Sequence, residues 1–167
     1  MAHPTVLVAC ADWRADIDVE LAPLVLELWR AGIETVSACQ DEGEAFADFA
    51  DTAPWLAEQA RLYARRAYVD VADLATVARL LDAVANAGPR DALYRRMSSP
   101  ATPGAWEVRV TFYDALATMG TGDWNNPSTF ANGVVRVRFP RSDSAEVARR
   151  LTAWNAGQRG PFAAPAD

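Results

Sequence analysis

The sequence contains no lysine, because Arg supplies all 16 of its Lys and Arg residues. Schiff-base chemistry, a Ser-Lys dyad and a phosphate-binding loop that depends on lysine are therefore excluded. Histidine is nearly absent as well, since His3 is the only one in the chain. A metal site that needs several histidines is excluded. A Ser-His or Cys-His dyad would have to use His3. This residue lies close to the N-terminus, and chain termini are usually poorly ordered.

Cysteine is also scarce, and the two present are Cys10 and Cys39. A secreted disulfide scaffold holds far more cysteines, and the N-terminal segment lacks the basic stretch of a signal peptide. The apolar runs fall well short of the roughly 20 residues that span a membrane. We therefore expect a cytoplasmic protein with reduced thiols, no membrane partner and no disulfide.

The charge balance is mildly acidic, with a formal net charge of −6 and a pI near 4.8. An acidic excess disfavours non-specific binding to nucleic acids and membranes. Arg occurs in three adjacent pairs, but such pairs are typical of solvated helix faces. Nucleic acid is therefore an unlikely class of partner.

A chain of 167 residues is long enough to bury a sizeable core without metals or disulfides. We expect a single α+β domain over 1–157 with an inserted acidic turn and helix at about 40–66. Residues 158–167 are expected to form a loose C-terminal tail.

Hydrophobic periodicity predicts the regular elements. The clearest strands are 106–113 and 134–139, where apolar and polar residues alternate. Apolar β-rich runs predict three more strands, at 5–10, 33–39 and 66–71. Apolar stripes predict helices at 19–31, 74–87 and 142–155, with a shorter helix within 52–66. The segment 11–18 is predicted as a polar loop in which Asp16 or Asp18 caps the first helix.

The resulting order, β-α-β-(insert)-β-α-β-β-α, matches a ferredoxin-like split βαββαβ plan extended by a further βα unit. Helices would lie mainly on one face of a single, largely antiparallel sheet. A doubly wound α/β fold is the rival, but it requires near-continuous apolar strands rather than the alternation seen here.

A right-handed crossover would make the first two strands parallel, so their carboxyl ends would meet at one edge of the sheet. Thiols, carboxylates, an Arg and an indole would converge there. The candidate ligand-binding residues are Cys10, Trp13, Arg14, Cys39, Asp41 and Glu42. The spacing is not diagnostic of metal ligands or of a cofactor, so neither is assigned.

This edge predicts a small-ligand binding domain, with a regulatory role as one form of it. One alternative is a small enzyme that uses a metal ion or acid–base carboxylates at the same edge. Another is an interaction protein or homodimer without an active site, which would expose an apolar patch on the 114–133 loop or on an edge strand.

The strand face that carries Arg136 and Arg138 points away from the expected core. If the strands 106–113 and 134–139 pair as a hairpin, Arg109 and Glu107 share this face. Close Arg residues repel unless acids or an anion lie between them. We therefore expect acids of the 40–51 segment, a second subunit or an anionic ligand to cover it.

The segments 16–44, 67–71 and 85–97 resemble small proteins of high-GC actinobacteria and their phages. The resemblance runs through most of the chain. No activity is known for these proteins, so the resemblance implies no function and carries over no functional residues.

Overall fold

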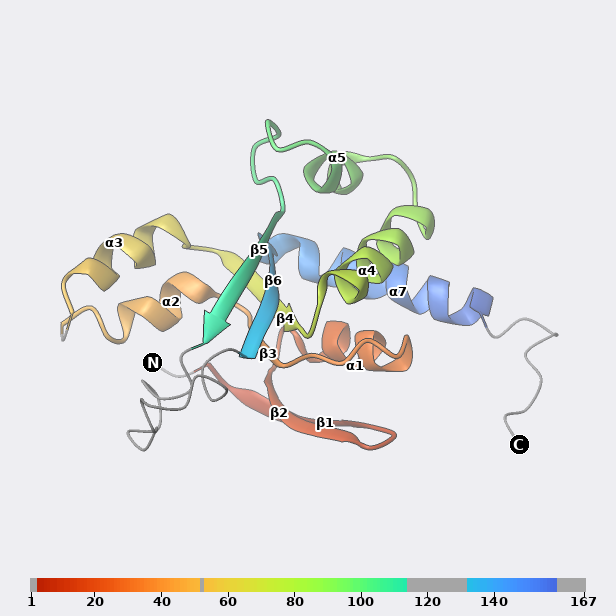
Figure 1. Ribbon diagram of the computed structural model, residues 1–167, viewed down its shortest axis with the longest axis horizontal. Coiled ribbons are helices and arrows are strands. Elements are labelled where there is room, and N and C mark those ends of the chain that lie inside the picture. The colour runs from red at the N-terminus through yellow and green to blue at the C-terminus, as the bar shows by residue number, and fades with distance from the viewer. Residues whose placement is uncertain (1–2, 52, 114–131, 159–167) are drawn as a thin grey trace.

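The computed structural model describes residues 3–51, 53–113 and 132–158, which form an α+β protein with two antiparallel sheets (Figure 1). The larger sheet has the strand order β3-β4-β6-β5. Its strands are β3 (Ser37–Cys39), β4 (Arg66–Val71), β5 (Glu107–Tyr113) and β6 (Asn132–Pro140). The helices are α1 (Ala22–Arg30), α2 (Glu42–Ala47), α3 (Trp55–Leu62), α4 (Leu74–Asn86), α5 (Ala92–Ser98) and α7 (Ser144–Gln158).

The two strands predicted from alternation, β5 and β6, pair antiparallel in the larger sheet, which is the condition on which the expected Arg face depends. In the register of β5 and β6, Glu107 lies opposite Arg138, and Arg109 lies opposite Arg136. The other side of β6 pairs antiparallel with β4, where Asp70 lies opposite Arg136. Charged residues of three strands therefore share one face of this sheet.

The prediction of a single sheet was wrong. β1 (Thr5–Cys10) pairs antiparallel with β2 (Trp13–Asp18) in a separate two-stranded sheet. The segment predicted as a polar loop alternates in burial, because Ile17 is buried whereas Asp16 and Arg14 are exposed. Ala11 takes a positive φ of 50° and allows the tight two-residue turn between the strands. The split βαββαβ topology is not confirmed.

One apolar cluster joins the two sheets. Ala67, Val69 and Val71 of β4, with the alternate residues of β6, point to the side covered by α1, α4 and α7 (Figure 1). Val8 and Ile17 of the hairpin belong to the same cluster. Burial of about twenty apolar side chains in one place is the main stabilising contribution expected for this fold.

The opposite face of the larger sheet is covered by the short helix α2. Glu42 of α2 accepts hydrogen bonds from Arg136 and Arg138. Of the three covers expected for this face, the structure shows the first, an acid of the 40–51 segment, although the third Arg of the hairpin, Arg109, is exposed. Gly43 fits this position because a Cβ would lie 2.6 Å from the backbone oxygen of Ala60 in α3.

Several element boundaries differ from the predicted ones. The first helix begins at Ala22, with Pro23 in its first turn, and neither Asp16 nor Asp18 caps it. β3 is only three residues long, and the acidic turn at 40–44 is the start of α2. α5 was not predicted. Asp73 caps α4, since its side chain accepts a hydrogen bond from the backbone N–H of Thr76.

Two expectations concern residues outside the described ranges. They are a functional role for the 114–133 loop, of which 114–131 is not described, and the loose tail, of which 159–167 is not described. Among the described residues, no helix has the length and apolar character needed to cross a membrane.

Candidate functional site

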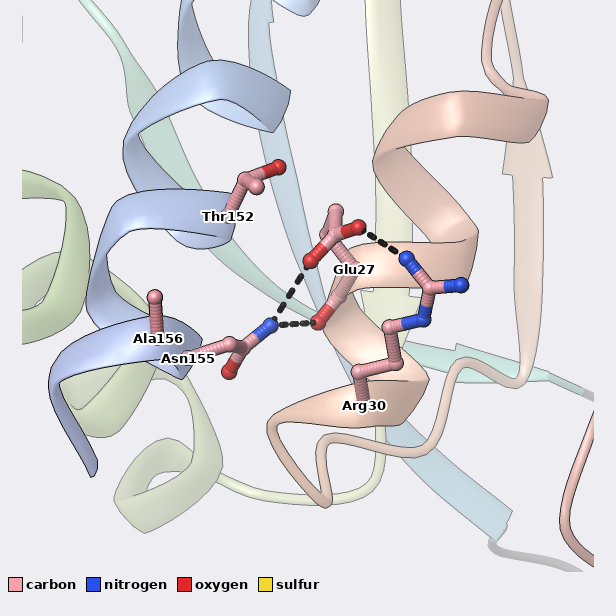
Figure 2. A pocket seen from close by; sticks show the side chains of 5 residues that line it. All are labelled: Glu27, Arg30, Thr152, Asn155 and Ala156. Carbon is pink, nitrogen blue, oxygen red and sulfur yellow. Dashed lines mark hydrogen bonds and ion pairs between the residues drawn. The ribbon is translucent and has the colours of Figure 1, made fainter. Parts of the chain in front are cut away.

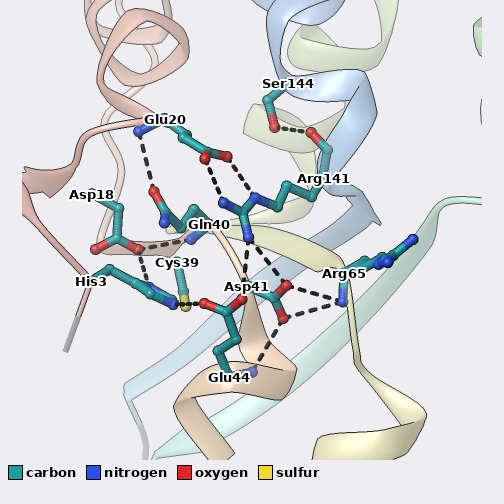
Figure 3. A network of polar contacts seen from close by, with 10 residues as sticks. All are labelled: His3, Asp18, Glu20, Cys39, Gln40, Asp41, Glu44, Arg65, Arg141 and Ser144. Carbon is teal, nitrogen blue, oxygen red and sulfur yellow. Dashed lines mark hydrogen bonds and ion pairs between the residues drawn. The ribbon is translucent and has the colours of Figure 1, made fainter. Parts of the chain in front are cut away.

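Three side chains with different donor atoms meet where the N-terminal segment and the ends of β2 and β3 come together (Figure 3). Nδ1 of His3 lies 3.1 Å from Oδ2 of Asp18 and 3.9 Å from Sγ of Cys39. One donor atom of each residue lies within 4.8 Å of those of the other two. We call His3, Asp18 and Cys39 the donor cluster.

The imidazole of His3 lies between two carboxylates. Its Nε2 is 2.8 Å from Oε2 of Glu44, and its Nδ1 faces Asp18. Because ionised carboxylates only accept hydrogen bonds, an imidazole that carries both protons donates to both of them. If a cation replaced the Nδ1 proton, the hydrogen bond from Nε2–H to Glu44 would remain. A hydrogen bond from the other ring nitrogen to a carboxylate is what orients the imidazole of metal-binding histidines.

The other two donors are positioned by β-structure. Asp18 is the last residue of β2, and its Oδ2 also accepts a 2.8 Å hydrogen bond from the backbone N–H of Gln40. Cys39 is the last residue of β3. The side-chain oxygen of Gln40 accepts from the backbone N–H of Glu20, so the chain segments on both sides of the cluster are held together.

The thiol of Cys39 is protonated at neutral pH. Burial raises its pKa to about 11, and the negative charges of Asp18, Glu42 and Asp41 act in the same direction. A hydrogen bond from the backbone N–H of Asp41 opposes this effect. The environment therefore disfavours a free thiolate nucleophile, whereas a bound cation would offset the surrounding negative charge.

Arg141 connects the acidic residues around the donor cluster (Figure 3). Its guanidinium donates to both carboxylate oxygens of Glu20 and lies 3.4 Å from oxygens of Asp41 and Glu44. The hydrogen bond with Arg141 lowers the pKa of Glu20 and raises that of Arg141. Arg141 thus neutralises part of the charge without contacting the three donors.

The donor set, and the two separations measured from Nδ1 of His3, are compatible with three ligands of a four-coordinate transition-metal site. Imidazole nitrogen, carboxylate oxygen and thiolate sulfur are the ligands of Zn²⁺, with bonds of about 2.0–2.3 Å. Tetrahedral geometry then places neighbouring ligand atoms about 3.3–3.8 Å apart. The observed separations of 3.1 Å and 3.9 Å around Nδ1 of His3 bracket that range.

The structure brings three of the six candidate residues to this region. Cys39 belongs to the donor cluster. Asp41 is buried, caps α2 through Glu44 and accepts from the backbone N–H of Arg65. Glu42 is bound on the far side by Arg136 and Arg138. Neither acid is free to bind a ligand.

The structure does not bring the other three candidates to the cluster. Cys10 and Trp13 face each other at the turn of the hairpin, where Trp13 packs on Trp29 with ring centroids 6.2 Å apart and Arg14 is exposed. The turn is five strand residues, or about 17 Å, from the end that carries Asp18. The expected parallel arrangement was wrong, because β1 and β3 belong to different sheets.

Sequence reasoning missed His3, Asp18 and Glu44 as site residues. His3 was discounted for its place near a terminus, and Asp18 was interpreted as a helix cap. The alternation of Trp13, Ala15 and Ile17 with charged residues is a strand signal. It would have placed Asp18 at the end of a strand, beside the first residues of the chain.

Apart from the donor cluster, a hollow lies between α1 and α7 (Figure 2). It measures about 340 Å³ and is lined by Glu27, Arg30, Thr152, Asn155 and Ala156. The carboxylate of Glu27 already accepts from Nη1 of Arg30 at 2.5 Å and from Nδ2 of Asn155 at 2.9 Å. Its polar groups are bound to one another, so this hollow offers a weaker case for a ligand than the donor cluster does.

The case for a function depends on the residues of the chain itself. Comparison with protein-family models, with curated proteins and with solved structures gives no match.

Proposed function

We propose that this protein binds a divalent transition-metal ion, of which Zn²⁺ is the best fit, through His3, Asp18 and Cys39. The sequence predicted a small-ligand pocket without a metal and named a metal ion only in the enzyme alternative, so metal binding goes beyond the predicted function. The observation that carries the proposal is the convergence on one point of a nitrogen, an oxygen and a sulfur donor from three separate chain segments.

The choice of metal follows from the donors. Hard cations such as Mg²⁺ and Ca²⁺ prefer sites made of oxygen ligands, whereas the donor cluster contains a sulfur and an imidazole nitrogen. Mixed N, S and O ligands in tetrahedral geometry favour Zn²⁺. Glu44 supports the assignment, because its hydrogen bond to Nε2 of His3 turns Nδ1 toward Asp18 and Cys39.

Binding would displace protons. Cys39 gives up its thiol proton when it binds a metal, so affinity must rise with pH. Because the pKa of Cys39 in the metal-free protein is raised to about 11, this dependence should continue well above neutral pH. Proton release on addition of Zn²⁺ is thus a direct signature of the proposed ligand set.

The test uses Co²⁺ as a spectroscopic substitute for Zn²⁺ in tag-free, full-length protein. We expect tetrahedral d–d bands and a sulfur-to-cobalt charge-transfer band that added Zn²⁺ abolishes. Cys39→Ser should remove the charge-transfer band. Cys10→Ser is the matched control, because it removes the other thiol, which lies outside the donor cluster, and it should leave the band unchanged.

Two further variants distinguish a specific metal site from incidental Zn²⁺ binding. Asp18→Asn should weaken Zn²⁺ binding in calorimetry, and Glu44→Gln should weaken it by about tenfold through the loss of the charge that orients His3. Absence of binding by the wild type, or a charge-transfer band that survives in Cys39→Ser, would reject the proposal. The donor cluster would then be a structural network of hydrogen bonds.

The enzyme alternative follows from the number of ligands. Three protein donors leave a fourth position for water, as in catalytic zinc sites, unless Glu44 turns in to fill it. Azide added to the Co²⁺ protein distinguishes a fourth position held by water from one filled by Glu44. A spectral shift supports an exchangeable water, as in an enzyme, and an unchanged spectrum supports a closed binding site.

The cellular setting is part of this proposal. Cys10 and Cys39 are both free thiols, which supports a reducing compartment such as the cytoplasm. We also propose that the chain is related to the small actinobacterial and phage proteins that its segments 16–44, 67–71 and 85–97 resemble.

A further inference from the structure

An open hollow of about 390 Å³ lies where the first residues of β4 and β5 meet the loop that follows α5. This volume falls in the range of about 300–1,000 Å³ that is usual for small-molecule sites. The hollow shares no residue with the donor cluster. Its polar lining includes Arg66, Gly104 and Glu107, and its apolar lining includes Leu62, Pro100 and Trp106.

Arg66 differs from the other arginines that are buried or half-buried in the described part of the chain. Each of the others donates a hydrogen bond of 2.5–2.9 Å to a carboxylate: Arg96, Arg136, Arg138, Arg141 and Arg150. Arg66 is only 14% exposed, yet the carboxylate beside it, Oε1 of Glu107, lies 3.5 Å from its Nη2. The other oxygen of Glu107 is bound by Arg138 at 2.8 Å. Arg66 therefore lacks the close acidic partner that the other five have.

Part of the guanidinium of Arg66 is free to donate. Nη2 donates to the backbone oxygen of Ala105 at 2.8 Å, which holds the group beside the hollow. Nε and Nη1 have no hydrogen-bond partner among the described residues. No fully buried side-chain nitrogen or oxygen of these residues lacks a partner, so both atoms are accessible from outside. The backbone N–H of Gly104, in the turn that the hydrogen bond from Ala105 to Thr102 closes, also has no partner there.

The positive charge of Arg66 is poorly compensated. Burial lowers its pKa, and the charge of Arg138 acts in the same direction although Glu107 opposes both. Hydrogen bonds to carboxylates instead raise the pKa of Arg96 and of Arg141. A half-buried cation with free N–H donors is complementary to an anion, which would supply the missing negative charge.

We propose that the hollow binds the carboxylate group of a small organic monoanion, with Arg66 as its anchor. A guanidinium matches a carboxylate in shape, because it can donate two parallel hydrogen bonds to the two oxygens. Leu62, Pro100 and Trp106 offer apolar surface to the body of such a ligand. Glu107, which is 46% exposed at the same hollow, disfavours a doubly charged group such as phosphate.

An NMR titration of the isotope-labelled, full-length protein with sodium benzoate, at constant ionic strength, tests the proposal. We expect saturable shifts of the side-chain Nε–H of Arg66 and of the backbone N–H of Gly104, with a Kd of about 1 mM. Benzamide has the same ring without the charge and should cause no saturable shift. Inorganic phosphate should bind more weakly than benzoate, and tighter binding of phosphate would overturn the choice of a carboxylate.

Arg66→Gln should weaken benzoate binding by at least about tenfold, as followed at Gly104, because it removes the charged donors. Arg65→Gln is the matched control, since it removes the same charge from a neighbouring exposed residue that does not line the hollow. Its Kd should stay within about twofold of the wild-type value.

Glu107→Gln gives a readout that does not depend on the stability of Arg66→Gln. Removal of a negative charge at roughly 6 Å from the bound carboxylate should tighten benzoate binding about threefold. A wild type without saturable shifts would overturn the proposal. So would an unchanged Kd in Arg66→Gln that folds, as judged by circular dichroism, or weaker binding in Glu107→Gln.

Discussion

Replacement of Glu42 by Gln should strongly destabilise the protein. Glu42 lies between two guanidinium groups: its Oε1 is 2.6 Å from Nη1 of Arg136 and 3.0 Å from Nη2 of Arg138, and its Oε2 accepts from Nε of Arg138. Its side chain is only 3% exposed. Glutamine removes the negative charge and places an amide N–H₂ where both neighbours are donors.

The expected cost is about 3 kcal/mol, the lower end of the range for a buried ion pair that loses one partner. It does not reach the upper end because each Arg keeps other contacts. Arg136 remains bound to both oxygens of Asp70 at 2.8 and 2.9 Å, and Arg138 remains bound to Glu107 at 2.8 Å. Each guanidinium also lies over an aromatic ring, Tyr68 or Tyr63.

Urea unfolding followed by tryptophan fluorescence measures this cost. For a chain of this size, about 3 kcal/mol corresponds to a fall in Tm of roughly 6–12 °C. Glu107→Gln is the control: this carboxylate also binds Arg138 but is 46% exposed, so its loss should cost less than about 1 kcal/mol. Equal effects of the two variants, or a cost below about 1 kcal/mol for Glu42→Gln, would refute the reasoning.

Four other predictions test different parts of the fold. Gly88→Ala should cost about 1–3 kcal/mol in urea unfolding, because the new Cβ would lie 2.6 Å from the guanidinium of the fully buried Arg150. Gly157→Ala in α7 meets nothing within 4 Å and should stabilise the protein by up to about 1 kcal/mol. Cys39, with its pKa raised to about 11, should resist iodoacetamide at pH 8 in the folded, metal-free protein and react once urea is added; rapid alkylation of the folded protein would contradict this. Hydrogen bonds from two Arg residues lower the pKa of Glu146 from 4.5 to about 2, so its stabilising effect should be present above pH 4.5 and disappear as the pH falls toward 2. The difference in unfolding free energy between wild type and Glu146→Gln should follow that course, and a pH-independent difference would contradict it.

The regular elements with strong local patterns were predictable from the sequence. Alternation in β5 and β6 predicted their pairing, and the apolar stripes predicted α4 and α7. These signals are local because a strand or helix repeats its buried side every two or about 3.6 residues. The same alternation, with Arg136 and Arg138 on the outer face, predicted that something anionic or a second subunit covers them, and the structure decided for an acid of the 40–51 segment.

Local patterns could not decide which strands share a sheet. β1 was expected to run parallel to β3 in one sheet, but it pairs with β2 because two residues, one of them Ala11 with a positive φ, reverse the chain. A two-residue turn without Gly or Asn gives little warning in the sequence. Because the strand pairing was predicted wrongly, Cys10 was also wrongly expected to lie beside Cys39 in the ligand-binding site.

The sequence alone determined the chemistry that is possible here: with no lysine, one histidine and two thiols, nitrogen and sulfur ligands are few, whereas carboxylates are plentiful. Only the tertiary structure decided which of them meet. His3, Asp18 and Cys39 are separated along the chain by 15 and 21 residues, and β2, β3 and the N-terminal segment bring them within 4.8 Å of one another. The physical reason is that donor type is a property of each residue, whereas convergence depends on strand pairing, which long-range packing selects.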